Sequence, residues 1–178
     1  MRCPFRGNQE GGVRVSQNIL VVYKKNFEDV HDEALDIVKN TLEDISEELD
    51  IKVNYSAREK VSREDFIGRD LVVVLGGDGT LTSIAHSVDE KTPVMGVNSH
   101  PREMDNDGSY GFYMGSDPIN FGEDIQKALS NDAIVNILPR LQAEISTTSG
   151  NIIRSDPALN DLLLANTHPY QPSKYKLQ

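Results

Sequence analysis

Cysteine and tryptophan are almost missing from this chain: its 178 residues contain one cysteine, Cys3, and no tryptophan. A single thiol can form neither an internal disulfide framework nor a thiolate metal cluster. Disulfides persist mainly in oxidising compartments, so their absence fits a reducing setting. The cysteine content therefore predicts a cytoplasmic protein.

Long apolar runs are also missing. No run approaches the roughly 18 residues that a membrane-spanning helix needs, so the sequence predicts no membrane partner. The first eighteen residues, MRCPFRGNQEGGVRVSQN, lack the apolar segment of a secretory signal. They are polar and contain glycine, which predicts a flexible N-terminal tail over residues 1–17.

Positive charge is scarce. Eighteen Lys and Arg stand against 28 Asp and Glu, for a formal net charge of −10. A nucleic-acid-binding protein would carry a basic face, so this class is not expected. An anionic ligand would have to be held by backbone N–H groups, a helix N-terminus, a few local cations or Mg²⁺.

Short β-rich runs alternate with helical patterns over most of the chain. Strands are predicted for ILVVY (19–23), IKVNYS (51–56), LVVVL (71–75) and PVMGVN (93–98). Helices are predicted over 28–49, 80–88 and 117–131. Near-continuous apolar strands separated by helices are typical of a parallel sheet covered on both faces. The predicted fold class is therefore α/β, with a Rossmann-like N-terminal domain of mostly parallel sheet over residues 18–135.

Two of these helices carry apolar residues that should face the core. The first set is Val30, Ala34, Ile37 or Val38, Leu42, Ile45 and Leu49, and the second is Leu81, Ile84, Ala85 and Val88. Both sets follow the 3.6-residue period of a helix with one buried face.

The pattern changes after residue 132. Residues 133–156 alternate between apolar and polar around a Ser-Gly-Asn turn, and ALNDLLLAN (158–166) and KYKLQ (174–178) are predicted to be strands. Strands joined by turns predict an antiparallel unit, an incomplete C-terminal β domain over 136–178. A sheet without a closing partner leaves an open edge, which predicts self-association into a homo-oligomer.

The stretch LVVVLGGDGTLTSIAHSV, residues 71–88, holds the main candidate site. In open α/β sheets, ligands bind beyond the carboxyl ends of the strands. Gly76, Gly77 and Gly79 allow positive φ angles and close approach of a phosphate, and the start of the following helix adds positive potential. Asp78 could accept a proton from an attacking hydroxyl or hold Mg²⁺. The alternative is a plain strand-to-helix turn.

Two common phosphate-binding motifs do not fit this stretch. A Walker-type G-x-x-x-x-G-K-[ST] sequence is absent, and the spacing of Gly77, Gly79 and Thr82 departs from G-x-G-x-x-G.

GGDGT after an apolar strand resembles the signature of a kinase superfamily that includes NAD kinases, diacylglycerol and sphingosine kinases, and phosphofructokinases. Later stretches resemble NAD kinases in particular. They are Gly96-Val97-Asn98 followed by Gly111-Phe112-Tyr113, Ile137 to Leu141 at the domain crossing, and Ala158-Leu159-Asn160-Asp161-Leu162. Lipid kinases of the superfamily usually carry Asn-Glu directly after GGDGT, where this chain has Leu81-Thr82-Ser83.

The resemblance spans about residues 19–178 and has two departures. The loop over 99–110 is longer than in most bacterial members and is more like a divergent branch that includes a mitochondrial form. The Gly/Thr/Ser-rich segment that usually closes over the nucleotide is not found, so we expect a C-terminally truncated member of the family.

The resemblance implies phosphorylation of the 2′-hydroxyl of the adenosine ribose of NAD, with ATP or polyphosphate as donor and Mg²⁺ or another divalent metal. Asp78 would be the general base or the group that orients the hydroxyl. The implied binding residues are Gly76, Gly77, Gly79 and Thr80 on the phosphate side, Phe112 and Tyr113 at the adenine end, and Asn160 and Asp161 on the ribose hydroxyls. Asn98 is a further expected nucleotide- or substrate-binding residue.

Each of these assignments has an alternative. Phe112 and Tyr113 can be core aromatics, and Asn160-Asp161 an ordinary strand entry. Arg102, Arg140 and Lys174 are candidate anion contacts or plain surface charges, and His86 and His100 have no partner at metal-ligand spacing. Asp105-Asn106-Asp107-Gly108 lacks the glutamate of a calcium loop and is better explained as a turn. For the whole chain, the alternatives are a diacylglycerol-type lipid kinase and an inactive nucleotide-binding module.

Overall fold

The computed structural model describes residues 16–25, 29–103, 106–147, 149–166, 168 and 170–172. Cys3, Asp105, Lys174, the strand predicted over 174–178 and all but the end of the predicted tail lie outside these residues. The chain divides into two compact units, the first ending at Asn136 and the second beginning at Ile137.

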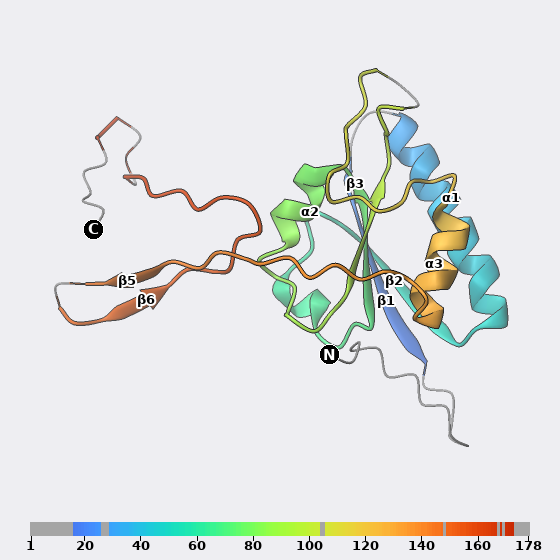
Figure 1. Cartoon of the computed structure of the whole chain (residues 1–178), viewed down its shortest axis with the longest axis horizontal. Helices are drawn as coiled ribbons and strands as arrows, with labels where there is room; N and C mark the ends of the chain where they lie inside the picture. The colour runs from blue at the N-terminus through green and yellow to red at the C-terminus, as the bar shows by residue number, and fades with distance from the viewer. Residues whose placement is uncertain are drawn as a thin grey trace. The chain divides into compact units, whose positions relative to one another are not determined.

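The first unit is built on a four-stranded sheet. Its strands are β1 (Gln17–Tyr23), β2 (Ile51–Ala57), β3 (Leu71–Gly76) and β4 (Val94–Asn98). They pair in the order β2-β1-β3-β4, and all three pairings are parallel (Figure 1). The register sets Ile19 of β1 against Leu71 of β3, and Val72 of β3 against Val94 of β4. The predicted parallel α/β sheet is confirmed.

Helices cover both faces of this sheet, as Figure 1 shows: α1 (Asp29–Glu48) and α3 (Phe121–Ser130) on one side, and α2 (Asp78–Ile84) on the other. A 3₁₀ helix, η1 (Arg63–Phe66), lies between β2 and β3. All six residues of β3 are buried, because alternate side chains of a central strand point into the two layers. The continuous apolar runs in the sequence reflect this double burial.

The apolar face of α1 differs from the predicted one at Leu49 and Leu35, and the side chain of Val30 lies outside the described part of the chain. The prediction left open whether Ile37 or Val38 faces the core. Val38 is fully buried whereas Ile37 is 44% exposed, so Val38 is the core residue. Leu49 is 39% exposed, because the helix ends at Glu48 and the next residue leaves the packed layer. Leu35, which was not predicted, is buried instead.

The helix after the GGDGT strand begins earlier than predicted. Gly77 is its N-cap, and the Gly77 carbonyl accepts hydrogen bonds from the N–H groups of Thr80 (2.8 Å) and Leu81 (3.4 Å). Asp78 is therefore the first residue of α2, and the helix is seven residues long. The helix was predicted to reach residue 88 but ends at Ile84. The predicted apolar set of Leu81, Ile84, Ala85 and Val88 is nevertheless buried, with Ala85 and Val88 beyond the end of the helix.

The helix predicted over 117–131 begins at Phe121. Asp117 Oδ1 accepts hydrogen bonds from the N–H groups of Ile119 (2.8 Å) and Asn120 (3.0 Å), so these residues form a turn before the helix. Asn131 ends α3 in the left-handed region, with φ of 65°, as asparagine does at helix C-termini.

The second unit contains an antiparallel hairpin of β5 (Glu144–Ser146) and β6 (Ile152–Arg154). The strand predicted over 158–166 is wrong. Only Ala158 pairs, through reciprocal hydrogen bonds with Leu141 of 2.7 and 2.8 Å. The rest of this segment has no neighbouring strand in the described part of the chain, and its apolar sequence alone cannot supply the hydrogen bonds of a ladder.

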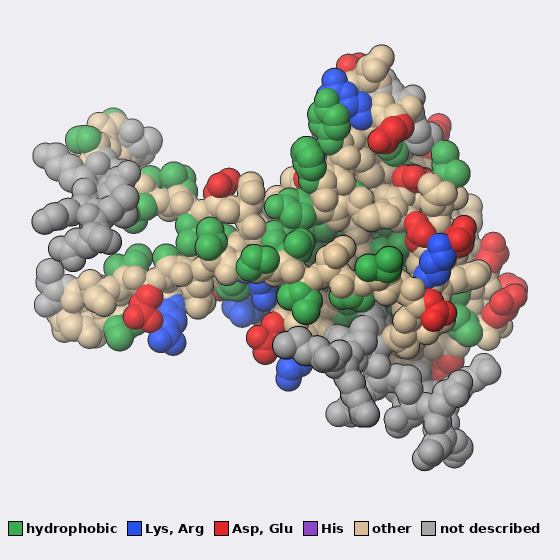
Figure 2. Space-filling model, viewed as in Figure 1, with side chains coloured by type: hydrophobic (Ala, Val, Ile, Leu, Met, Phe, Trp, Pro, Cys, Tyr) green, Lys and Arg blue, Asp and Glu red, His purple; other side chains and the backbone are tan. Residues whose placement is uncertain are grey.

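Apolar side chains of the second unit are exposed (Figure 2). Ile152 and Ile153 on β6 are 60% and 54% exposed, and Leu163 is 90% exposed. A two-stranded hairpin has no second layer to bury such residues, which is why isolated hairpins are marginal in water. None of the described helices is long and apolar enough to cross a membrane.

Candidate functional site at the carboxyl edge of the parallel sheet

The strand order places the candidate site at a topological switch point. From β1 the chain passes to β2 on one side, and it then returns to β3 on the other side of β1. Ligands of open α/β sheets bind where the connections diverge in this way, beyond the carboxyl ends of the strands. β3 ends at Gly76, so Gly77 and Asp78 lie at this edge.

Asp78 is held by a turn more than thirty residues further along the chain. Its Oδ2 accepts a hydrogen bond from the N–H of Phe112 (2.9 Å), and its Oδ1 accepts one from the N–H of Tyr113 (2.7 Å). Each oxygen of a carboxylate offers two acceptor sites, so each keeps one free of these two bonds. The structure therefore brings together the acid of GGDGT and the two aromatics of Gly-Phe-Tyr.

Asn98 is buried, and its side chain is engaged within the protein. Its Nδ2 donates to the Ser109 carbonyl (3.1 Å), and its Oδ1 accepts from the Ser109 hydroxyl (2.9 Å). At Gly111, φ is +66° and an added Cβ would lie 2.7 Å from Asn98 Nδ2, so this position requires glycine. Asn98 thus positions the loop that carries Phe112.

The three glycines of the motif do not adopt positive φ angles, contrary to our expectation. Gly77 is extended, with φ of −108°. A Cβ at Gly76 would collide with the side chain of Thr80, which is buried and packs beneath the turn. A Cβ at Gly79 would meet nothing within 4 Å. Close packing explains Gly76, whereas the open space at Gly79 leaves the backbone accessible to a ligand.

Two lysines that sequence reasoning missed follow β1 at the same edge. The Lys24 N–H donates to the Leu75 carbonyl (3.0 Å), so Lys24 lies beside the last residues of β3. Lys24 is half-buried and Lys25 is exposed. These cations lie at the switch point of a chain with a net charge of −10. Their signal in the sequence is a pair of lysines directly after a buried strand.

The charge of Lys25 also acts on the end of β2. The pKa of the Glu59 carboxyl lies below its ordinary value, mainly because the carboxyl accepts a hydrogen bond from the backbone N–H of Glu59 itself. A hydrogen bond from Arg58 and the charges of Arg58 and Lys25 add to this effect against partial desolvation. Arg58 Nη2 and Glu59 Oε1 are 2.8 Å apart.

A buried histidine ties α1 to the same edge. His31 Nδ1 lies 2.7 Å from Ser99 Oγ, and the Ser99 N–H donates to the Gly76 carbonyl (3.0 Å). The His100 ring meets that of His31 edge to face, with centroids 6.2 Å apart. His31 was not among the predicted site residues, because a lone histidine in a helix has no distinguishing pattern.

Breaking this contact should loosen the turn before Asp78. We expect His31→Ala and Ser99→Ala each to lower the free energy of unfolding, with a coupling of about 1 kcal/mol between them. Urea unfolding of both single variants and the double variant measures this coupling. The exposed His86 offers a matched control, and His86→Ala should change stability by less than about 0.5 kcal/mol. Strictly additive single variants would contradict the contact.

The remaining predicted residues belong to the second unit or to the loop after β4. Asn160 and Asp161 belong to the second unit, where they are exposed and Asn160 Nδ2 donates to Asp161 Oδ2 (3.0 Å). Their approach to Asp78 stays a prediction. Arg140 lies near the start of the same unit and is half-buried. Arg102 is exposed in the loop after β4, and its guanidinium lies 4.5 Å above the ring centroid of Tyr110.

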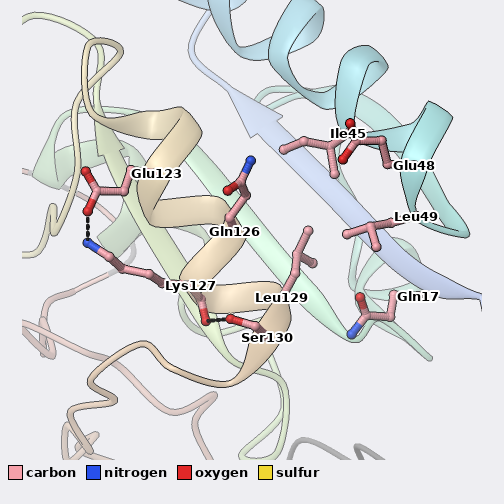
Figure 3. Close-up of a pocket in the computed structure, with 9 residues that line it drawn as sticks. All are labelled: Gln17, Ile45, Glu48, Leu49, Glu123, Gln126, Lys127, Leu129 and Ser130. Carbon is pink, nitrogen blue, oxygen red and sulfur yellow. Dashed lines mark hydrogen bonds and ion pairs between the residues drawn. The ribbon is translucent and has the colours of Figure 1, made fainter.

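A hollow of about 560 Å³ lies at the opposite end of the sheet (Figure 3). Figure 3 shows it bounded by the end of α1, by α3 and by Gln17 at the start of β1. Lys127 pairs there with Glu123 at 2.6 Å. Since ligands bind at the carboxyl ends of parallel strands, this hollow at the amino ends is separate from the candidate site.

Comparison with known proteins agrees with the geometry. Residues 15–133 match the ATP-NAD kinase N-terminal domain. The chain is 28% identical over 119 residues to a probable NADH kinase of Oryza sativa subsp. japonica, which covers 61% of this chain and 35% of that protein. It is 30% identical over 154 residues to the NAD kinase of Syntrophobacter fumaroxidans, which covers 83% of this chain and 50% of that one.

A solved structure shares the fold. The NAD kinase of Archaeoglobus fulgidus in complex with ATP superposes with a TM-score of 0.54 at 20% identity, covering 87% of this chain and 51% of that one. The chain thus spans between about a third and a half of the length of the curated relatives named above.

Proposed function

This chain belongs to the NAD kinase family, and we propose that it acts in the transfer of a phosphoryl group to the 2′-hydroxyl of the adenosine ribose of NAD. ATP or polyphosphate is the proposed donor. One observation carries the proposal most directly: the Asp78 carboxylate stands at the switch point and is oriented by the N–H groups of Phe112 and Tyr113.

Phosphoryl transfer depends mainly on positioning and on neutralising charge. Asp78 keeps an acceptor site on each oxygen, with which it can hold the ribose hydroxyl in line with the donor phosphate. As the hydroxyl oxygen attacks the terminal phosphorus of the donor, the P–O bond to ADP or to the shortened polyphosphate breaks, and the same carboxylate takes up the hydroxyl proton as general base. The two backbone hydrogen bonds fix the direction of the carboxylate before substrate arrives.

A divalent metal fits this site only in combination with substrate. Among the described residues, no group of three or more His, Cys, Asp or Glu side chains could hold a metal ion. Mg²⁺ is commonly bound by one or two carboxylates together with substrate phosphates and water, and Asp78 can supply one such carboxylate. The metal would neutralise phosphate charge there, and Lys24 and Lys25 would add to that effect.

The second unit carries the two further residues that the resemblance assigns to the ribose hydroxyls, Asn160 and Asp161. Asn160 offers both donors and acceptors and Asp161 offers acceptors, which suits the hydroxyls of a ribose. The exposed apolar residues around the hairpin, such as Ile152 and Ile153, support the proposal that a second copy of the chain packs against this unit.

The test is formation of NADP from NAD, Mg²⁺ and either ATP or polyphosphate by the 178-residue chain, with NADH as a second acceptor. We expect turnover that stops when Mg²⁺ is chelated. Binding of NAD without turnover would instead identify an inactive nucleotide-binding module. Phosphorylation of diacylglycerol in place of NAD would identify a lipid kinase.

A further inference from the structure

The loop after β4 exposes two aromatic rings. Tyr110 is 66% exposed and Phe112 is 85% exposed. Their ring centroids are 6.0 Å apart and their planes are inclined by 31°, so the rings form one patch. Large aromatic side chains gain stability when buried, and contiguous exposed ones mark binding surfaces.

A cation extends this patch. The guanidinium of Arg102 lies 4.5 Å from the ring centroid of Tyr110, within the range of a cation–π contact. A stacked guanidinium can still use the N–H groups at its edge, and these match the oxygens of a phosphate. One surface thus presents aromatic rings beside a phosphate-binding group.

The loop holds this arrangement in place before any ligand arrives. The Arg102 N–H donates to the Ser109 carbonyl (3.0 Å), and the Ser109 N–H donates to the His100 carbonyl (2.9 Å). The Ser109 hydroxyl is anchored to Asn98 in turn. A preorganised surface loses less conformational entropy on binding than a flexible one.

The patch is continuous with the proposed catalytic carboxylate. The N–H of Phe112 donates to Asp78 Oδ2, so the backbone of the patch contacts the group that would orient the ribose hydroxyl. A nucleotide whose ribose reaches Asp78 would carry its base and phosphates within a few ångströms of that point. Continuity favours a nucleotide over a protein partner as the occupant.

We propose that Arg102, Tyr110 and Phe112 form a platform for an adenine nucleotide, in which Tyr110 contributes to stacking on the base and Arg102 binds a phosphate of the same ligand. This inference rests on the proposed function and adds two residues to its site, Tyr110 and Arg102. NAD and ATP both carry adenine and phosphate, so the shared chemistry is an adenine nucleotide and separate titrations identify the source.

The experiment compares calorimetric affinities of NAD and of ATP for the wild-type chain and for Tyr110→Leu, Tyr110→Phe and Arg102→Gln. Tyr110→Leu loses base stacking and should weaken the binding of at least one nucleotide by roughly tenfold. Tyr110→Phe keeps the aromatic ring and should bind with the affinity of the wild type. Arg102→Gln should weaken the binding of the same nucleotide. Tyr55→Leu, on the edge strand β2, is the matched control and should bind as wild type.

The outcomes separate the platform from the proposed function. If wild type binds both nucleotides and Tyr110→Leu binds each with unchanged affinity, the platform is refuted while the kinase proposal stands. If wild type binds neither NAD nor ATP, both are refuted. A loss confined to ATP or to NAD supports the platform and names its ligand. Melting temperatures equal to wild type show that the exposed substitutions leave the fold intact.

Discussion

Replacement of Asp78 by asparagine is expected to reduce NADP formation by about 10²- to 10⁴-fold, the usual contribution of a positioned general base. The amide of asparagine is not basic, so it cannot take up the proton of the ribose hydroxyl. The measurement is kcat with NAD, Mg²⁺ and ATP or polyphosphate. Unchanged kcat in Asp78→Asn would remove this residue from the proposed mechanism.

The same substitution also tests the turn that surrounds Asp78. The carboxylate accepts two N–H groups, one on each oxygen, whereas asparagine has only one side-chain oxygen. Its amide nitrogen would face a donor, so the turn at Phe112 and Tyr113 should loosen and the melting temperature should fall. Asp36→Asn is a suitable control, because Asp36 is exposed and lies 3.9 Å from Lys39 in a surface pair. Melting and NAD affinity of both variants separate a lost base from a disordered turn.

Alanine at Gly76 and alanine at Gly79 should have opposite effects on stability. The Gly76 Cβ would lie 2.8 Å from the Cβ of Thr80, and Thr80 is buried and cannot move aside. Overpacking of this kind costs about 1–3 kcal/mol. Gly79 is exposed within α2 with nothing near its Cβ position, so Gly79→Ala should stabilise the helix by up to about 1 kcal/mol. Urea unfolding measures both.

The functional effect of Gly79→Ala should run against its effect on stability. If a phosphate approaches the backbone at this position, the added methyl group should weaken nucleotide binding although the protein becomes more stable. A variant that is more stable and binds NAD and ATP as wild type does would show that Gly79 only forms the turn. Such a result would leave close packing, at Gly76 against Thr80 and at Gly77 against Ser109, as the structural reason for glycine in the motif.

Local composition was sufficient for the first unit of the fold. Four apolar runs predicted four strands, and their continuity predicted burial on both faces, because only a covered parallel sheet hides every residue of a strand such as β3. The predicted apolar faces of α1 and α2 were right for the side chains that the structure describes, except at Leu49. The predicted burial of Leu49 was wrong, because the point at which a helix leaves its packed layer depends on the neighbouring elements.

The second unit shows where local pattern fails. Leu162, Leu163 and Leu164 have the composition of a strand, yet they form no ladder in the described part of the chain. A strand is defined by a partner, and a partner distant in sequence cannot be read from the strand itself.

The candidate site was also predicted from the sequence only in part. The strand-turn-helix order made Asp78 a candidate, whereas the Gly-Phe-Tyr turn was predicted only through the resemblance to NAD kinases. Their contact, the anchoring of the loop by Asn98 and Ser109, the buried His31 and the lysines beside β3 all depend on strand order. Short-range preferences act between neighbours and leave their mark in the sequence, whereas the meeting of residues more than thirty positions apart is the result of packing the whole sheet.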